Sequence, residues 1–180
     1  MRIIAGERRG RRLTEFAGDD VRPTTDRVRE SVFNIIQMFI PDADVLDLFS
    51  GSGALSLEAL SRGAKSACCV DIDPRSIAII KKNAEATGYT DKCDIKNMSC
   101  FDFLDKTADK FDIIFLDPPY NKGFIEPVMK KIAEKKVLND GGIVMLESDS
   151  TDFHGDADGF SVYRQRRYGR TCITVYIQEG

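Results

Sequence analysis

The sequence contains a single histidine among 180 residues, and its five cysteines show no spacing typical of metal ligands. The histidine, His154, lies among aspartates and a glycine, which is more typical of a solvated loop than of an active site. These scarcities argue against a histidine-rich metal centre and a Ser-His-Asp triad, and we expect no metal. The odd cysteine count and the lack of an export signal favour reduced thiols in a cytoplasm.

Long hydrophobic runs are also missing. No segment approaches the apolar length needed to span a bilayer, and the first five residues lead into charges rather than a signal-peptide core. A composition of 42% hydrophobic and 31% charged residues is that of a soluble globular protein. We predict one domain over residues 1–180. We also predict a monomer, because no exposed apolar stripe is evident.

Arginine is unevenly distributed and forms a cluster near each end of the chain. The net charge is −3, yet two arginine clusters stand out: Arg8, Arg9, Arg11 and Arg12 near the start, and Arg164, Arg166, Arg167 and Arg170 near the end. Such clusters in an acidic protein are consistent with local phosphate contacts, and equally with solvated faces.

From residue 44 onward, apolar runs alternate with helical patterns. Strands are predicted at 44–49, 66–71, 93–97, 111–116 and 142–147, the last after a turn at 139–142, and helices at 54–62, 75–87 and 127–135. Two β-rich runs, 160–168 and 171–178, indicate a hairpin. Alternating strands and helices predict an α/β fold of Rossmann-like type. Its sheet is mostly parallel and twisted, has helices on both faces, and gains a C-terminal antiparallel hairpin.

Residues 1–41 do not share this alternation and are predicted to form an appendage on a core of residues 42–180. A short β segment and a basic turn are expected within 2–13. Arg22-Pro23-Thr24-Thr25-Asp26 supplies helix-start chemistry, and Pro41 should end the helix. The apolar face of this helix is predicted to consist of Val28, Val32, Ile35, Ile36 and Phe39.

The most informative stretch runs from Phe111 to Tyr120. Its apolar start predicts a buried strand, which the two prolines after Asp117 must end. The stiff loop that follows lies at the carboxyl end of a strand, where open α/β sheets bind ligands. It presents the carboxylate of Asp117 and the ring of Tyr120, which could bind an exocyclic amine and stack on a planar base. An ordinary strand-ending turn remains the plain alternative.

A second loop suggests a nucleotide-like cofactor. Gly51 and Gly53 let the backbone approach a ligand, and Asp71 follows where a nucleotide-binding sheet places an acid for ribose hydroxyls. A dinucleotide is the rival ligand, but Ser56 replaces the third glycine of that motif. Asp47, just before the turn, suits a cationic amino group better than a pyrophosphate. S-adenosylmethionine carries an ammonium, a ribose and an adenine, and no phosphate.

Taken together, these residues resemble class I S-adenosylmethionine-dependent methyltransferases, and Asp117-Pro-Pro-Tyr120 resembles the motif of enzymes that methylate exocyclic amines. The wider sequence is similar to the RsmD family of bacterial 16S ribosomal RNA guanine-N2 methyltransferases. The segments that carry this similarity are 2–6, 10–13, 22–30, 46–54, 58–64, 115–120 and 168–171.

The resemblance implies a role for each matching residue. The cofactor site would consist of Asp47, Phe49, Ser50, Gly51, Ser52, Gly53, Asp71, Ile72, Ser99 and Cys100, and the catalytic loop of Asp117, Pro118, Pro119 and Tyr120. Asp47 would lie near the ammonium and Ile72 would line the adenine pocket. Many relatives carry an acid at the position of Ser99. RNA contacts would come from Arg8, Arg9, Arg11, Arg12, Arg22, Arg166, Arg167 and Arg170.

The implied reaction is methyl transfer to guanine N2 of 16S ribosomal RNA, free or within an assembling 30S subunit. Hydrogen bonds from N2 to Asp117 and to the Pro118 carbonyl would favour pyramidalisation of a poor nucleophile and stabilise its developing charge. Tyr120 would stack on the splayed base. Other readings stay open: a DNA or RNA adenine-N6 methyltransferase, a small-molecule or protein-glutamine methyltransferase, and a non-catalytic RNA-binding scaffold.

Overall fold

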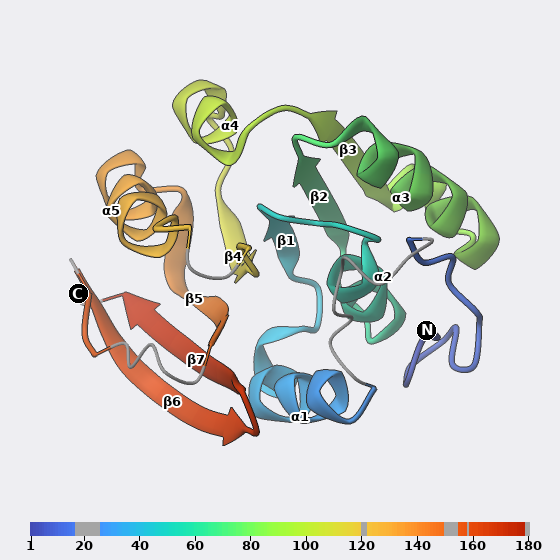
Figure 1. Ribbon diagram of the computed structural model, residues 1–180, viewed down its shortest axis with the longest axis horizontal. Coiled ribbons are helices and arrows are strands. Elements are labelled where there is room, and N and C mark those ends of the chain that lie inside the picture. The colour runs from blue at the N-terminus through green and yellow to red at the C-terminus, as the bar shows by residue number, and fades with distance from the viewer. Residues whose placement is uncertain (17–25, 120–121, 150–154, 158, 179–180) are drawn as a thin grey trace.

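The computed structural model describes residues 1–16, 26–119, 122–149, 155–157 and 159–178. Its centre is a seven-stranded sheet in the order β3-β2-β1-β4-β5-β7-β6 (Figure 1). The strands are β1 (Asp44–Asp47), β2 (Ser66–Asp71), β3 (Cys93–Asn97), β4 (Phe111–Leu116), β5 (Leu138–Asp149), β6 (Phe160–Tyr168) and β7 (Thr171–Gln178). The first five pair in parallel, and β7 joins β5 and β6 antiparallel. The predicted fold class is confirmed.

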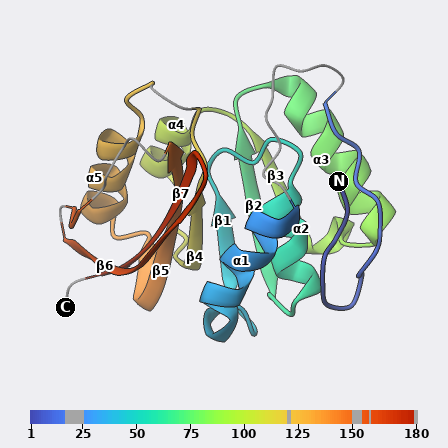
Figure 2. The ribbon, with the colours of Figure 1, turned by 60° about the horizontal axis from the view of Figure 1, so that its bottom comes forward.

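Helices cover both faces of the sheet (Figures 1 and 2). On one face lie α1 (Asp26–Ile36), α2 (Ala54–Ser61) and α3 (Pro74–Thr87), with apolar side chains packed on the odd-numbered residues of the central strands. On the other lie α4 (Cys100–Lys106) and α5 (Ile125–Lys135), packed on the even-numbered ones. Alternation along each strand therefore assigns every residue to a face, and this decides which side chains meet at the site.

The helix predicted within residues 1–41 is present, and its five predicted apolar residues belong to the core or pack against it, but Arg29 and Phe33 are buried as well. The structure buries Arg29, Val32, Phe33 and Ile36. Phe33 contacts Phe115 of β4 edge-on, with ring centroids 5.9 Å apart. The helix ends at Ile36 and continues as a 3₁₀ turn, Gln37–Phe39, rather than running unbroken to Pro41. This tighter turn rotates Phe39 relative to an ideal helix and leaves it partly exposed.

The β segment predicted in residues 2–13 is reduced to one antiparallel bridge between Arg2 and Arg12. Hydrogen bonds to α2 hold this segment in place of a strand ladder. The backbone N–H groups of Ile4 and Ala5 donate to the two carboxylate oxygens of Glu58, at 2.7 and 3.0 Å. Arg62 also donates to Glu58, at 2.8 Å. A fully buried carboxylate thus satisfies two backbone donors of the appendage.

Three further details differ from the predicted elements. Strand β1 ends at Asp47, two residues early, because the loop that follows turns away from the ladder. Strand β5 starts at Leu138 and includes the residues of the turn predicted at 139–142. These residues form an irregularity, because the pairing of β5 with β4 steps from Leu138 directly to Ile143. Helix α4 was not predicted; Ser99 begins it by accepting a hydrogen bond from the N–H of Asp102, at 3.0 Å.

Candidate active site at the carboxyl ends of the central strands

Four acidic side chains project from one face of the sheet near the carboxyl ends of its strands. Asp47 ends β1, Asp71 ends β2, Asp117 follows β4, and Glu147 lies in β5 beside it, one step beyond the Leu116–Leu146 pair. All four are odd-numbered and therefore share the face of α1, α2 and α3. Glu147 was not singled out from the sequence, although its place near the end of a predicted strand was the available signal.

The loop after β1 is shaped by a short hydrogen-bonded turn. The Ser50 hydroxyl donates to the Asp47 carbonyl at 2.8 Å, and the Gly53 N–H donates to the Ser50 carbonyl at 2.7 Å. Gly51 and Gly53 have φ angles of +53° and +77°, in the left-handed region that favours glycine. A Cβ at Gly53 would also lie 3.3 Å from Ile80. The two glycines are therefore required by the turn itself.

Asp71 uses both carboxylate oxygens to fix backbone. Its Oδ2 accepts from the Gly51 N–H and its Oδ1 from the Asp73 N–H, each at 2.8 Å. The loops after β1 and β2 are thus joined through one carboxylate, which keeps further acceptor capacity. The next residue, Ile72, has a side chain that is 72% exposed, so an apolar surface lies next to the carboxylate of Asp71.

Asp47, in contrast, is buried and, within the described residues, uses only one carboxylate oxygen as an acceptor. It is 1% exposed; its Oδ2 accepts from the Ser56 hydroxyl at 2.8 Å, while its Oδ1 is buried without a hydrogen-bond partner in the described part of the chain. Burial, and next the negative charge of Asp71, raise the pKa of Asp47 to about 7. A buried acceptor left unsatisfied is costly, so this oxygen fits a cationic ligand group such as an ammonium.

Asp117 completes an acidic cluster with Asp47, Asp71 and Glu147. Burial raises the pKa of its carboxyl well above the ordinary value, and the neighbouring charges of Glu147 and Asp47 raise it further. Pro118 is buried and Pro119 is exposed, so the proline pair anchors the loop on one side only. Tyr120 lies outside the described residues. Three clustered carboxyl groups in a poorly solvated place favour a ligand that carries positive charge.

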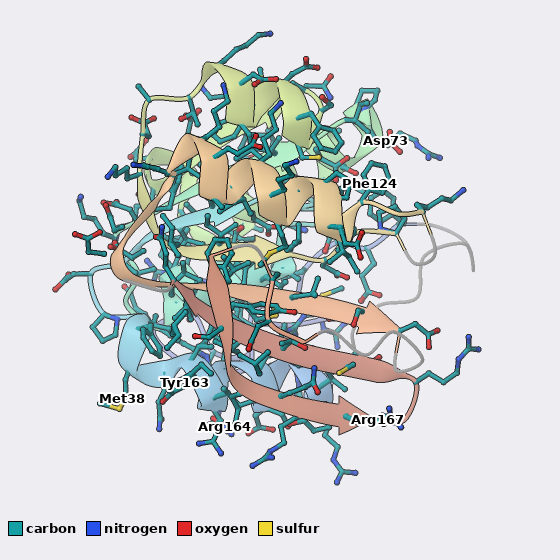
Figure 3. All side chains as sticks on the ribbon, turned by 90° about the vertical axis from the view of Figure 1, so that its left-hand side faces the viewer. Met38, Asp73, Phe124, Tyr163, Arg164 and Arg167 are labelled. Carbon is teal, nitrogen blue, oxygen red and sulfur yellow. The ribbon has the colours of Figure 1, made fainter. Side chains whose placement is uncertain are left out.

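The predicted cofactor residues Phe49, Ser99 and Cys100 lie near an aromatic cluster, whereas the carbonyl of Ser52 accepts a hydrogen bond from Asn83 of α3 at 2.9 Å. Phe49 contacts Phe124 edge-on with centroids 5.5 Å apart, and Phe101 stacks on Phe124 at 6.3 Å. Phe124 was not foreseen, because it precedes α5 far along the chain (Figure 3). Ser99 donates to the Asp102 carboxylate at 2.7 Å, so its hydroxyl serves the start of α4. Cys100 is buried, and burial raises the pKa of its thiol.

The structure disperses the predicted RNA-contacting arginines. Arg8 packs over the Tyr89 ring at 5.5 Å and donates its backbone N–H to Ser61, at the end of α2 away from the glycine turn. Arg9, Arg11 and Arg12 are exposed, whereas Arg22 lies outside the described residues. The carboxyl-terminal cluster divides between the two faces of β6: Arg166 pairs in register with Ile173, and Arg167 with Cys172. Arg170 contacts Asp149 at 3.2 Å.

Two absences hold for the described residues. Within the ranges given above, no helix is long and apolar enough to cross a membrane. Among the same residues, no group of three or more histidine, cysteine, aspartate or glutamate side chains could hold a metal ion.

Comparisons with known proteins give consistent results along the whole chain. The family described as "Conserved hypothetical protein 95" matches residues 1–177. Ribosomal RNA small subunit methyltransferase D of Escherichia coli K12 is 34% identical over 181 residues, which cover 100% of this chain and 91% of that protein. The enzyme of the same name from Haemophilus influenzae is 35% identical over 179 residues, covering 98% and 93%.

A solved structure agrees with the sequence relatives. The Escherichia coli protein described as "Putative methyltransferase yhhF" superposes with a TM-score of 0.89 at 33% identity, covering 99% of this chain and 98% of that one. The match extends through the first 41 residues as well as the sheet, so the amino-terminal segment is part of the shared architecture. Sequence and structure together show that this chain belongs to the family described as "Conserved hypothetical protein 95", the RsmD family of methyltransferases.

Proposed function

We propose that this chain transfers a methyl group from S-adenosylmethionine to the exocyclic N2 amine of a guanine in small-subunit ribosomal RNA. The observation that carries the proposal is the buried, partnerless Oδ1 of Asp47 beside Asp71 and Asp117. It fits a cofactor that bears an ammonium and a ribose. The names of the full-length relatives support ribosomal RNA of the small subunit as the substrate.

Each residue of the site has a task in this proposal. When bound, S-adenosylmethionine supplies an electrophilic methyl group on a sulfonium. Asp47 would accept a hydrogen bond from the cofactor ammonium through Oδ1, which also returns its carboxyl to the charged form. Asp71 would accept ribose hydroxyls through its remaining lone pairs. Ile72, Phe49 and the backbone near Cys100 would surround the adenine.

Asp117 would act on the amine. Its carboxylate and the Pro118 carbonyl would accept hydrogen bonds from guanine N2, stabilising the positive charge that develops as the methyl group arrives. The loop holds these acceptors in a fixed position at the sheet edge, which lowers the entropic cost of alignment. Tyr120 is proposed to stack on the base. The exposed arginines are proposed to hold phosphates.

The wider setting is part of the proposal. We place the reaction in the cytoplasm, on a monomeric enzyme that comprises a single domain, with residues 1–41 as an RNA-contacting appendage. The substrate is either free 16S RNA or an assembling 30S subunit.

The test is methyl transfer from tritiated S-adenosylmethionine to 30S subunits and naked 16S RNA from a strain that lacks the corresponding enzyme. Labelled N2-methylguanosine after nucleoside digestion is the expected product. Asp117→Ala should abolish it, while Asp91→Ala, an exposed acid of the turn before β3, should not. Labelled N6-methyladenosine would replace the guanine assignment with an adenine one. Absence of cofactor binding by calorimetry would favour a non-catalytic scaffold.

A further inference from the structure

A groove of 720 Å³ lies between α1 and the edge strand β6, and none of the acidic cluster lines it. Its walls come from the end of α1 with the 3₁₀ turn and from one face of β6 (Figure 3). The lining includes aromatic or apolar side chains with unusual exposure. Met38 is 86% exposed and Tyr163 is 48% exposed, and the Tyr163 ring contacts Phe39 with centroids 6.0 Å apart.

A β-bulge builds the β6 wall. Val162 pairs with Tyr176 and Arg164 with Val175, so Tyr163 is an extra residue without a cross-strand partner. The extra residue reverses the alternation of the strand. Before it, Val162 packs with the core of α4 and α5; after it, Arg164, Arg166 and Tyr168 face the α1 side. One inserted residue therefore moves two guanidinium groups and a tyrosine into the groove.

The charge of the groove is one-sided. No acidic side chain is among the described residues that line it, and within the described ranges neither Arg164 nor Arg166 has a carboxylate partner. The opposite wall offers the hydroxyl of Ser31 and the amides of Asn34 and Gln37. Guanidinium groups, aromatic rings and neutral hydrogen-bonding side chains are the combination that binds unpaired nucleic acid.

The groove is also aligned with the acidic cluster. Arg166 pairs with Ile173, which pairs with Glu147, which lies beside Asp117. The four residues form one row on the same face of the sheet, so Arg166 lies three strand spacings, about 14 Å, from Asp117. At a rise of about 3.4 Å per stacked nucleotide, roughly four nucleotides bridge this distance. From Arg166 the strand runs through Arg164 to Tyr163 over about 10 Å toward the far end of the sheet, and Tyr168 lies about 7 Å from Arg166 in the other direction.

We infer that this groove binds a single-stranded RNA segment a few nucleotides from the methylated base. Bases stack on Tyr163 and Tyr168, and phosphates pair with Arg164 and Arg166. The inference rests on the proposed function, since it needs an RNA substrate. It identifies a recognition surface separate from the catalytic loop, so this surface should act on substrate binding and not on the chemical step.

The first test compares two double variants in the transfer assay. Arg164→Ala/Arg166→Ala should raise KM for the RNA substrate tenfold or more, with kcat and cofactor affinity unchanged. It should also reduce the slope of log KM against log salt by about 1.4, for two lost phosphate contacts on a single strand. The control, Lys81→Ala/Lys82→Ala, removes equal charge from the exposed side of α3. Equal KM and equal salt slope in both variants would overturn the inference while the proposed function stands.

A second test addresses the ring. Tyr163→Ala should raise KM about tenfold, whereas Tyr163→Phe should restore it, because stacking on a base needs the ring and not the hydroxyl. Thermal unfolding of each variant provides the folding check. An equal effect of both substitutions would contradict stacking.

Ultraviolet crosslinking to 30S subunits then identifies the occupant. A nucleotide adduct on the β6 peptide, found by mass spectrometry, is the expected result. A crosslink from this peptide to a ribosomal protein alone would overturn the inference in favour of a protein-docking surface. If the wild-type chain methylates no RNA at all, the proposed function fails, and this inference fails with it.

Discussion

Asp47 and Asp71 end neighbouring parallel strands, yet their carboxyl groups differ in burial and in hydrogen bonding. Asp71 is partly exposed, and both its oxygens accept backbone N–H groups. Asp47 is buried, with one oxygen held by Ser56 and the other without a partner in the described structure. One carboxylate thus contributes to the local fold, whereas the other is destabilising until a cation arrives. Under the proposed function, Asp71 shapes the site, whereas Asp47 binds the ligand.

The largest expected effect follows from neutralising Asp47. Asp47→Asn keeps the size of the side chain and an acceptor for Ser56 but removes the charge opposite the cofactor ammonium. Loss of one partner from a buried ion pair costs about 3–5 kcal/mol, so affinity for S-adenosylmethionine should fall by about 100-fold or more. Isothermal titration calorimetry measures this. Retention of wild-type affinity would mean that the ammonium binds elsewhere.

The same substitution should stabilise the ligand-free protein. The native pKa of Asp47 is raised to about 7, against about 3.9 in the unfolded chain, so the native state binds more protons between these values. Stability therefore falls as pH rises through this window. Asp47→Asn should raise the free energy of unfolding by about 2–4 kcal/mol at pH 8 and by little at pH 4. Urea unfolding at the two pH values provides the measurement. An increase in the free energy of unfolding that does not depend on pH would exclude the raised pKa of Asp47 as its cause.

Asp71 should respond in the opposite direction. Asp71→Asn retains one acceptor but loses a charge-assisted hydrogen bond to either Gly51 or Asp73, at a cost of about 1.5–3 kcal/mol. Both stability and cofactor affinity should fall together, because the turn itself loosens. Thermal unfolding and calorimetry on the same samples test whether stability and cofactor affinity fall together. If Asp71→Asn were more stable than the wild type, the carboxylates of Asp47 and Asp71 would not differ in their effect on folding stability.

The smallest effect is expected at Glu147, through the pH dependence of the reaction. In the proposed mechanism methyl transfer needs ionised Asp117, so the rate should rise with pH through the pKa of Asp117. The charge of Glu147 raises that pKa. Glu147→Gln should therefore move the rising limb of kcat to lower pH. A limb that stays in place would show that Asp117 does not titrate in this range, or that Glu147 does not influence it.

Much of this arrangement was predictable from sequence, because the buried parallel strands have unmistakable apolar runs. Strands β2, β3 and β4 match their predicted bounds, and Asp71 and Asp117 follow from strand ends, whereas Asp47 was expected within a strand of residues 44–49. The roles of buried polar residues were not predictable. Nothing in the local pattern indicates that Arg29 lies on the buried face of α1 or that Glu58 binds the backbone of residues 4 and 5, since these depend on contacts between distant segments.

The groove was hidden from the sequence for a different reason. Strict alternation along β6 would place Val162 and Arg164 on the same face, but the bulge at Tyr163 separates them. Bulges depend on pairing with a neighbouring strand and leave no reliable local signature. The arginines at 164–170 were therefore grouped as one cluster, although the strand presents them on two faces.

The claim on which the account most depends is that the free oxygen of Asp47 receives the cofactor ammonium. The most direct measurement titrates wild-type protein and Asp47→Asn with S-adenosylmethionine and with methylthioadenosine, which has the same nucleoside but no amino-acid portion. We expect the substitution to weaken the binding of S-adenosylmethionine by about 100-fold or more and to leave the binding of methylthioadenosine nearly unchanged. Equal losses for both ligands would contradict it, because Asp47 would then act on the nucleoside or on the shape of the loop.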